Sequence, residues 1–451
     1  MDDPVTIILE SHGMEIPSQL NTYTSPPTVF IETHGCKLNS ADSQDIAGQF
    51  VSLGCIVVDD VLDADIYVLN TCTVTQQADT KARKALRAAG RTNPAVVLSA
   101  TGCYVERRPG EVLQVNTQAG TPIVLGNTDK SIFASEVLKS LLNKTRNPNN
   151  PLRLSAGSEA LHRTRSMIKI QEGCNQVCAY CIVPKVRGRE RSMPLQGLIA
   201  RASQLGSEGV SEIVLTGTQL GTYGHEFSDL NLGTLLKALS KVPNLMRIRV
   251  SSLQAHEITP DLLALWDEKM FCPHFHIPLQ SGSDRILRSM RRRYTAQQFR
   301  NAVALIRESV PEASITTDVI VGFPGELASD FDATYQLCQE LKLNKIHVFP
   351  YSIRPGTSAV YKSDHIELQL IKSRSKELRL LSKNLERRAR LRLRGVRRVV
   401  LWESSQVVNG EMIWSGLTED YVRVSAICNE DMKGKMTPVE FISSDQIVIV
   451  K

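Results

Sequence analysis

The spacing of apolar residues in the first third of the chain alternates between two periods. Short apolar runs predict strands over 29–31, 66–69 and 95–98, and helical spacing predicts helices over 42–53 and 76–89. Such alternation predicts a small parallel sheet with helices on its faces. We expect this first α/β domain to cover 27–145. Residues 1–26 show no period and predict a loose extension, and the Asn- and Pro-rich segment 143–151 predicts a linker.

A longer series of the same kind runs from Met167 to about residue 360. Helical stretches such as 198–208 and 296–309 separate its apolar runs, which predict strands over 168–170, 212–215, 247–250, 274–276, 314–317 and 345–348. Six strand–helix units predict a partial (βα)6 barrel within a domain over 160–385. In that architecture the chemistry lies at the carboxyl ends of the strands.

The pattern changes again towards the C-terminus. Residues 367–394 have the spacing of a long amphipathic helix rich in Lys and Arg, which is either a solvated face or an RNA contact. After Gly395 short β runs predict strands over 398–401, 410–414, 421–424 and 446–450. These runs predict a small antiparallel β-barrel of the OB type within a domain over 386–451. The fold class is therefore α/β with a C-terminal β-barrel.

Composition limits the classes of protein that the chain can be. Its 451 residues are 42% hydrophobic and 22% charged, which is typical of a globular protein of several domains. No apolar run approaches a membrane span, and the first residues lack the pattern of a signal peptide, so we expect a cytoplasmic protein with no membrane partner. The net charge of +6 favours an anionic partner such as nucleic acid.

Three cysteines lie within one short segment, Cys174, Cys178 and Cys181. Three thiolates can hold a four-iron cluster and leave one iron open. The spacing, three residues and then two, resembles that of the radical S-adenosylmethionine (SAM) enzymes, in which the open iron binds the amino and carboxylate groups of SAM. A structural zinc site is the alternative, but zinc prefers four ligands, and no fourth Cys or His lies within ten residues.

Cys36, Cys72 and Cys103 each follow one of the three predicted N-terminal strands by a few residues. Because loops after successive parallel strands meet at one edge of a sheet, these thiols are expected to converge on a second three-cysteine cluster. Three unrelated buried cysteines are the alternative. Four further cysteines share no such register, and we interpret them as packing residues: Cys55, Cys272, Cys338 and Cys428.

Together these residues resemble the methylthiotransferases, radical SAM enzymes that insert sulfur and a methyl group into a C–H bond. Tyr180, Pro184 and the segment Arg-Gly-Arg-Glu-Arg-Ser at 187–192 also match. The resemblance implies an N-terminal domain with an auxiliary cluster, a radical SAM domain and a C-terminal RNA-binding TRAM domain. It implies two [4Fe-4S] clusters and two SAM molecules per turnover, one as the methyl donor and one as the source of a 5′-deoxyadenosyl radical.

Four segments resemble the branch of this family that acts on N6-threonylcarbamoyladenosine at position 37 of tRNA, next to the anticodon. They are 35–39, 290–295, 317–326 and 347–352, and the first and last are the more discriminating. The expected activity is methylthiolation of carbon 2 of that base. Pro355 is closer to the isopentenyladenosine branch, so that substrate stays an alternative, as does an aspartate of a ribosomal protein. An RNA-binding iron–sulfur sensor without turnover is the alternative outside enzymes.

Polar residues at predicted strand ends are candidates for binding SAM beside the radical cluster, because they share one edge of the sheet. Each of them alone is also compatible with a helix cap. The candidates are Thr216, Gly217, Ser251, Ser252, Gln280, Thr317, Asp318, His347 and Phe349.

Basic residues are the candidates for contact with tRNA, whose loop bases stack on planar side chains and whose phosphates attract Lys and Arg. They are Arg291, Arg292, Arg293, Arg354, Arg387 and Arg388. The resemblance also implies an electron donor such as flavodoxin or ferredoxin, and a sulfur donor that the sequence does not identify.

Overall fold

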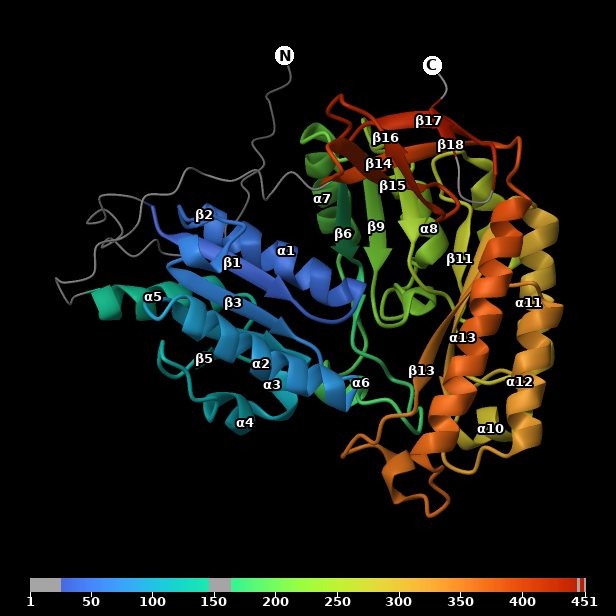
Figure 1. Cartoon of the computed structure of the whole chain (residues 1–451), viewed down its shortest axis with the longest axis horizontal. Helices are drawn as coiled ribbons and strands as arrows, with labels where there is room; N and C mark the ends of the chain where they lie inside the picture. Colours follow the sequence, from blue (N-terminus) through green and yellow to red (C-terminus); the bar gives the residue numbers. More distant parts are fainter. Residues whose placement is uncertain (1–25, 146–163, 444–446, 450–451) are drawn as a thin grey trace. The chain divides into compact units, whose positions relative to one another are not determined.

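The computed structural model describes residues 26–145, 164–443 and 447–449. The predicted N-terminal extension lies outside these residues apart from Pro26, and so does most of the predicted linker. The described residues divide into two compact units: the smaller takes in 26–35, 42–73 and 77–145, and the larger 36–41, 74–76, 164–443 and 447–449 (Figure 1).

The smaller unit contains a parallel five-stranded sheet in the order β2-β1-β3-β4-β5. Its strands are β1 (Thr28–Thr33), β2 (Ile56–Val57), β3 (Ile66–Thr71), β4 (Val97–Gly102) and β5 (Ile123–Val124). Its helices are α1 (Lys37–Ser52), whose first residues group with the larger unit, η2 (Val61–Asp63), α2 (Gln76–Thr92), α3 (Cys103–Arg107), α4 (Pro109–Leu113) and α5 (Phe133–Thr145).

Helices cover both faces of this sheet because its central strand is apolar on both sides. In β3 all six residues are buried. Leu69 packs on one side with Leu86 of α2, and Val68 packs on the other with Phe50 of α1 and Phe133 of α5. This two-faced burial is typical of parallel sheets.

The larger unit contains six parallel strands whose order in space follows their order in the chain. They form two sheets, β10-β9-β6 and β11-β12-β13, and a parallel bridge between Ile248 and Phe271 brings the two together. The strands are β6 (Arg165–Lys169), β9 (Glu212–Thr216), β10 (Arg247–Val250), β11 (His274–His276), β12 (Ser314–Val321) and β13 (Lys345–Pro350). A short hairpin, β7 (Gln171–Glu172) and β8 (Arg191–Ser192), follows β6.

Helices pack on the outer face of these strands, where Ile315 of β12 meets Phe299 in the apolar core. On the opposite face of β12 lie polar residues, Thr316 and Asp318, so that the interior of the open barrel is polar.

The helices and 3-10 turns of the larger unit are α6 (Val183–Val186), α7 (Leu195–Ser207), η4 (Leu220–Thr222), α8 (Leu232–Leu239), η5 (Ala255–Glu257), α9 (Pro260–Leu263), η6 (Ala264–Asp267), α10 (Asp284–Ser289), α11 (Ala296–Ser309), α12 (Ala328–Glu340), η7 (Ser358–Tyr361) and α13 (Leu368–Leu391).

The C-terminal part of the larger unit is an antiparallel sheet in the order β16-β15-β14-β17-β18. Its strands are β14 (Arg397–Val408), β15 (Glu411–Thr418), β16 (Arg423–Ile427), β17 (Met436–Phe441) and β18 (Ile447–Ile449). Because β16 also approaches β18, the sheet curls towards a closed barrel. Trp402 is fully buried in its core.

A buried ion network joins this sheet to the amino ends of β9 and β10. Glu212 of β9 accepts hydrogen bonds from Arg247 (2.5 Å) and Arg249 (2.9 Å). The two guanidinium groups also donate to the carbonyl oxygens of Leu417 and Thr418. The C-terminal sheet therefore closes the end of the barrel opposite the carboxyl ends of its strands.

The α/β class, the six-stranded open barrel and the C-terminal β-barrel agree with the prediction from sequence. The strands that the sequence pattern missed are short or atypical. Four of them, β2, β5, β7 and β8, have two residues each, and β17 contains Pro438, which lacks the N–H that strands use for pairing. No helix in the described part of the chain has both the length and the apolar character needed to cross a membrane.

Candidate active site

The three-cysteine segment follows β7 and is held in place by backbone hydrogen bonds. Cys174 N–H donates to Gly188 O (3.2 Å), and Ala179 N–H donates to Met290 O (2.9 Å). Gly173 has a φ of 76°, and a Cβ atom there would lie 1.9 Å from Arg189 O. Only glycine fits this turn, so the entry into the segment is set by the close approach of the hairpin.

Cys174, Cys178 and Cys181 lie close enough for their thiols to interact electrostatically. Burial raises the pKa of the Cys181 thiol to about 12, and the neighbouring thiols of Cys178 and Cys174 add to the increase. The three sulfur atoms do not all lie within 4.8 Å of one another, the span within which a single ion could take all of them.

Arg292 lies beside these thiols. Its Nη1 donates to Cys178 Sγ at 3.3 Å, its Nη2 donates to Gln254, and its guanidinium lies 4.8 Å from the ring centre of Tyr294. Sequence reasoning placed Arg292 among RNA contacts, together with Arg291 and Arg293. The structure leaves those two neighbours exposed and directs Arg292 to the cysteine segment.

Gln171 connects the cysteine segment to the carboxyl end of β9. Its side-chain Nε2 donates to Gly173 O (3.0 Å), and its Oε1 accepts from the N–H groups of Thr218 and Gln219 (both 2.9 Å). A Cβ atom on Gly217 would lie 2.9 Å from Gln171 O, so a glycine is needed for this approach. The sequence pattern contained no signal that pointed to Gln171.

The predicted SAM-binding residues lie on adjacent strands, but they do not all present free polar groups. Two of them lie at the end of β9: Thr216 is its last residue and Gly217 follows it. Ser251 and Ser252 follow β10 directly, and both pairs lie at the edge next to Gln171. The Thr317 hydroxyl, in contrast, donates to Ile277 O (2.6 Å) and accepts from Leu279 N–H (2.9 Å), so it stabilises the connection after β11.

Gln280 and Phe349 also differ in their surroundings. Gln280 is buried with a φ of 64°, and its backbone bridges to β12. Phe349 of β13 is 44% exposed. Gln280 therefore shapes the turn after β11, whereas the Phe349 ring is available to a ligand.

Four chargeable side chains gather in the interior of the open barrel, and we call them the inner-face cluster: Lys37, His276, Asp318 and His347. The ligand atoms of the two histidines and Asp318 lie within 4.8 Å of one another, and His276 Nε2 lies 3.2 Å from Asp318 Oδ2. The pKa of Lys37 is lowered to about 8. Burial is the largest cause, and the positive charges of Arg249 and Arg165 outweigh the nearby carboxylates, which raise the pKa. Burial also lowers the pKa of His347.

The other predicted cysteine triad follows three neighbouring strands. Cys72 directly follows β3, Cys103 directly follows β4, and both are buried; Cys36 comes three residues after β1 and is exposed. Gly102 has a φ of 95°, and a Cβ there would lie 2.5 Å from Thr71 O. Since β1, β3 and β4 are adjacent and parallel, their carboxyl ends share one edge of the sheet.

The remaining cysteines pack in apolar surroundings. Burial raises the pKa of Cys55 and of Cys338 to about 12, and that of Cys272 to about 11. Cys428 packs against the core of the C-terminal sheet.

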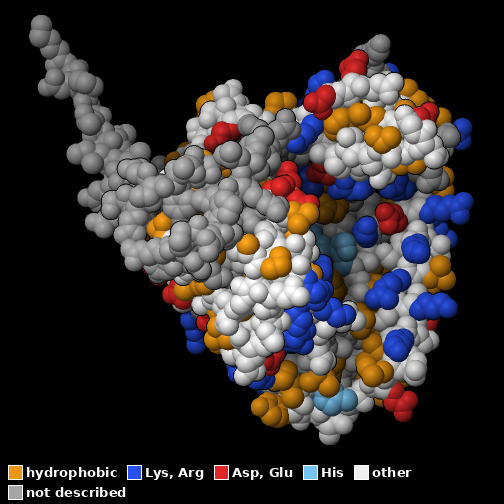
Figure 2. Space-filling model, turned by 60° about the vertical axis from the view of Figure 1, so that its left-hand side comes forward, with side chains coloured by type: hydrophobic (Ala, Val, Ile, Leu, Met, Phe, Trp, Pro, Cys, Tyr) orange, Lys and Arg blue, Asp and Glu red, His pale blue; other side chains and the backbone are white. Residues whose placement is uncertain are grey.

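The predicted RNA-contact residues divide into exposed and buried groups. Arg291, Arg293, Arg387 and Arg388 are exposed, whereas Arg354 is 2% exposed. Because of this burial, Arg354 is shielded from a ligand at the surface. Figure 2 shows Lys and Arg side chains gathered along its right-hand side, over the larger unit.

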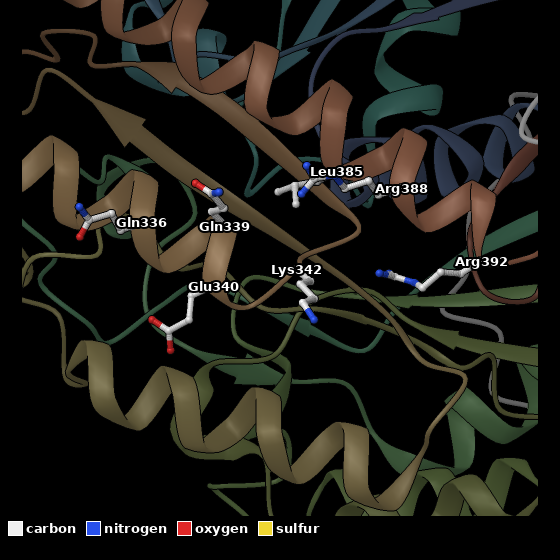
Figure 3. A pocket seen from close by; sticks show the side chains of 7 residues that line it. All are labelled: Gln336, Gln339, Glu340, Lys342, Leu385, Arg388 and Arg392. Atoms are coloured by element: carbon white, nitrogen blue, oxygen red, sulfur yellow. The ribbon is translucent and has the colours of Figure 1, made fainter.

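A pocket of about 540 Å³ lies between α12 and α13 (Figure 3). It is lined by Gln336, Gln339, Glu340, Lys342, Leu385, Arg388 and Arg392. The side chain of Arg392 extends towards Lys342 in this view, so basic groups dominate one side of the pocket. This pocket lies on the outer helical layer rather than at the carboxyl ends of the strands.

Comparison with known proteins identifies the family. The model of the radical SAM superfamily matches residues 168–338, and that of "Uncharacterized protein family UPF0004" matches 28–124. The threonylcarbamoyladenosine tRNA methylthiotransferase MtaB of Bacillus subtilis is 35% identical over 92% of this chain and 94% of its own length. The chain belongs to the radical SAM methylthiotransferases.

Other members of this methylthiotransferase family match almost as well. MtaB of Aquifex aeolicus is 38% identical over 73% of the chain and 82% of its own length. A tRNA-2-methylthio-N(6)-dimethylallyladenosine synthase of Dictyoglomus thermophilum is 33% identical over 92% of the chain and 96% of its own length. The solved structure of the radical SAM methyltransferase TsrM from Kitasatospora setae shares the fold, with a TM-score of 0.53 at 14% identity over 74% of this chain and 75% of that one.

Membership of this family makes the chain an enzyme and identifies its cofactors as [4Fe-4S] clusters and SAM. The residues present fit these groups. Three free thiols, one buried and two half-buried, lie in one segment, with Arg292 beside them and the glycine-containing end of β9 next to them.

Proposed function

We propose that this methylthiotransferase modifies tRNA, and that it adds a methylthio group to carbon 2 of N6-threonylcarbamoyladenosine at position 37, next to the anticodon. The observation that carries the proposal is the 35% identity to MtaB of B. subtilis over nearly the whole of both chains. It extends through the auxiliary-cluster, radical SAM and TRAM domains that we propose for 27–145, 160–385 and 386–451. The cytoplasm, which holds tRNA, is the compartment that this function requires.

Within this proposal, Cys174, Cys178 and Cys181 hold the radical cluster. The auxiliary cluster belongs to the other triad: Cys36, Cys72 and Cys103. When bound, the clusters and SAM supply one-electron chemistry, sulfur and the methyl group. The chain itself holds the thiolates, orients SAM and keeps water away from the reacting carbon.

The carboxyl ends of β9 and β10 are the proposed cradle for SAM. Gly217 lets a ligand approach the backbone closely, and Ser251 and Ser252 provide hydroxyl groups one strand away. Gln171 couples this edge to the cysteine segment, so that both are positioned together.

The proposed contacts with tRNA are Arg291 and Arg293 after α10, and Arg387 and Arg388 on α13, where the basic pocket also lies. Exposed guanidinium groups bind phosphates without regard to sequence, and this binding weakens as salt is added. An electron donor such as flavodoxin or ferredoxin and a sulfur donor complete the proposed partners.

Nucleoside analysis tests the function directly. Expressed in cells that lack their own methylthiotransferases, the chain is expected to produce 2-methylthio-N6-threonylcarbamoyladenosine in tRNA, detected by mass spectrometry, while isopentenyladenosine stays unmodified. Methylthiolated isopentenyladenosine, or a methylthiolated ribosomal protein with unchanged tRNA, would replace the proposed substrate. If no 5′-deoxyadenosine formed after anaerobic incubation with SAM and dithionite, the alternative would hold instead, that of an RNA-binding iron–sulfur sensor without turnover.

Arg292→Met is expected to make the reduction potential of the radical cluster more negative and to slow SAM cleavage about 10–100-fold. Arg292 places a half-buried positive charge 3.3 Å from Cys178 Sγ, and this charge would stabilise the reduced form of a cluster held there. A redox titration followed by electron paramagnetic resonance measures the potential. The matched control is Arg293→Met, an exposed neighbour, for which an unchanged potential is expected. Equal potentials for both variants would assign Arg292 a packing role only.

A further inference from the structure

The inner-face cluster lies outside the SAM cradle proposed at the carboxyl ends of β9 and β10, although two of its members, Asp318 and His347, were candidates for SAM binding from sequence. Lys37, the residue after Cys36, groups with the larger unit and lies over the ring of Tyr421 at 5.6 Å. Among the described residues no carboxylate lies within 4.0 Å of its ammonium, and the ring of His347 makes no hydrogen bond. The only carboxylate of the cluster, that of Asp318, already pairs with His276.

This charge distribution favours an anion. A half-buried ammonium without a close counter-ion is costly. The positive charges of Arg249 and Arg165 act on Lys37 more strongly than the negative charges of Glu212 and Asp318. A metal cation at His276, Asp318 and His347 would add to the same positive charge. A ligand with a carboxylate, in contrast, would neutralise the ammonium and accept a hydrogen bond from His347.

The two residues come from distant parts of the chain. Lys37 stands in segment 35–39 and His347 in segment 347–352. The Tyr421 ring under Lys37 stacks on the ring of His274 at 4.1 Å, and on the same strand the ring centre of His276 lies 5.7 Å from that of His347. His347 lies next to Asp318 in the paired strands β12 and β13. The barrel interior therefore brings together, beside Cys36, two groups that suit one carboxylate.

We propose that Lys37 and His347 bind the carboxylate of the threonylcarbamoyl group on the substrate adenosine, and so select a base that carries an amino-acid substituent. The inference rests on the proposed function, since it concerns the same substrate. An isopentenyl group has no anion to offer, and its binding would leave the ammonium uncompensated. Sites built around a polar substituent reject analogues that lack it far more strongly than apolar pockets reject a change in size.

The test compares anticodon stem–loops that carry threonylcarbamoyladenosine with others in which the threonyl carboxylate is replaced by a carboxamide. For the wild-type enzyme kcat/KM is expected to be about 10²–10⁴-fold higher with the acid, mainly through KM. For Lys37→Met this preference is expected to fall to less than about 10-fold. His347→Phe is expected to reduce it in the same direction. Binding of both stem–loops to metal-free protein, measured by fluorescence, is expected to show the same loss of preference.

The acid-to-amide preference is a ratio on one preparation, so it stays valid if Lys37→Met binds less iron. Lys237→Gln, an exposed change on α8, is the matched control and is expected to keep the wild-type ratio. Equal kcat/KM for acid and amide with the wild type, or an unchanged ratio in both Lys37→Met and His347→Phe, would overturn the inference while the function stands. No methylthiolation of threonylcarbamoyladenosine by the wild type would overturn the proposed function instead.

Discussion

Replacement of Cys174, Cys178 or Cys181 by alanine is expected to abolish the production of 5′-deoxyadenosine from SAM, and with it all methylthiolation. The iron content of anaerobically purified protein should fall from about eight to about four atoms per chain, because one of two four-iron clusters loses a ligand. Iron analysis and chromatography of the SAM products measure the two effects.

The physical reason lies in the incomplete ligation of the cluster. The three thiolates would hold three of the four irons, so the loss of one thiolate would leave a second iron without a protein ligand. No other cysteine stands in this segment to replace a lost ligand, since the nearest cysteines in the sequence are Cys103 and Cys272.

The other triad should give a different pattern. Cys72→Ala or Cys103→Ala is expected to halve the iron content and to stop methylthiolation, but to leave 5′-deoxyadenosine production in place. This difference separates the two clusters, because the proposed SAM site lies with the other cysteines.

Cys338→Ala is the matched control. Cys338 is fully buried in the apolar core of the larger unit, so its loss should cost about 1 kcal/mol of stability and leave iron unchanged. Full SAM cleavage in any of Cys174→Ala, Cys178→Ala and Cys181→Ala would contradict the proposed cluster site.

Glu212→Gln is expected to lower the free energy of unfolding by about 3–5 kcal/mol, because it leaves Arg247 and Arg249 buried without their counter-charge. These guanidinium groups also donate to carbonyl oxygens of the C-terminal sheet, so the loss should affect the contact between barrel and sheet. Urea unfolding followed by circular dichroism measures it.

The same carboxylate predicts how stability depends on pH. Burial by itself would raise the pKa of Glu212, but Arg249 and Arg247 outweigh it and hold the pKa at about 2, below the ordinary value of 4.5. A carboxyl whose pKa is depressed in the folded protein stabilises it above the unfolded pKa. Its contribution, about 3 kcal/mol, is therefore complete above pH 4.5 and is lost as the pH falls towards 2.

Glu340→Gln provides the comparison. Glu340 forms an ion pair with Arg300 at the surface, where such pairs contribute less than about 1 kcal/mol. If Glu212→Gln and Glu340→Gln were equally stable, or if Glu212→Gln kept the acid sensitivity of the wild type between pH 4.5 and 2, the buried network would not stabilise the fold.

Much of the architecture was predictable because strand and helix periods are local. The sequence pattern predicted the strands at 247–250 and 274–276 and the helix at 296–309 with the bounds that the structure has. The pattern missed β17, where Pro438 interrupts the β signal, and it began α1 five residues late. Packing, not periodicity, determined those elements.

The roles of single polar residues were harder to predict. Arg291, Arg292 and Arg293 are identical in type, and only the turn after α10, where Arg291 has a φ of 58°, directs the middle one to Cys178. The sequence made Arg354 a candidate for contact with RNA, yet its side chain is buried. Nothing in the local sequence distinguishes an arginine that faces solvent from one that faces a thiol.

The sequence by itself determined the order of the three folded parts and the six cysteines proposed as ligands, because a ligand set is written in residue types and their spacing. Only the tertiary structure decided that Lys37, from the start of α1, lies with His276, Asp318 and His347 inside the barrel. It also decided that Glu212 holds two buried guanidinium groups, one of which, that of Arg249, lies over the same Tyr421 ring as Lys37. Electrostatic interactions depend on distances through space and on burial, and both arise only when strands far apart in the chain are packed together.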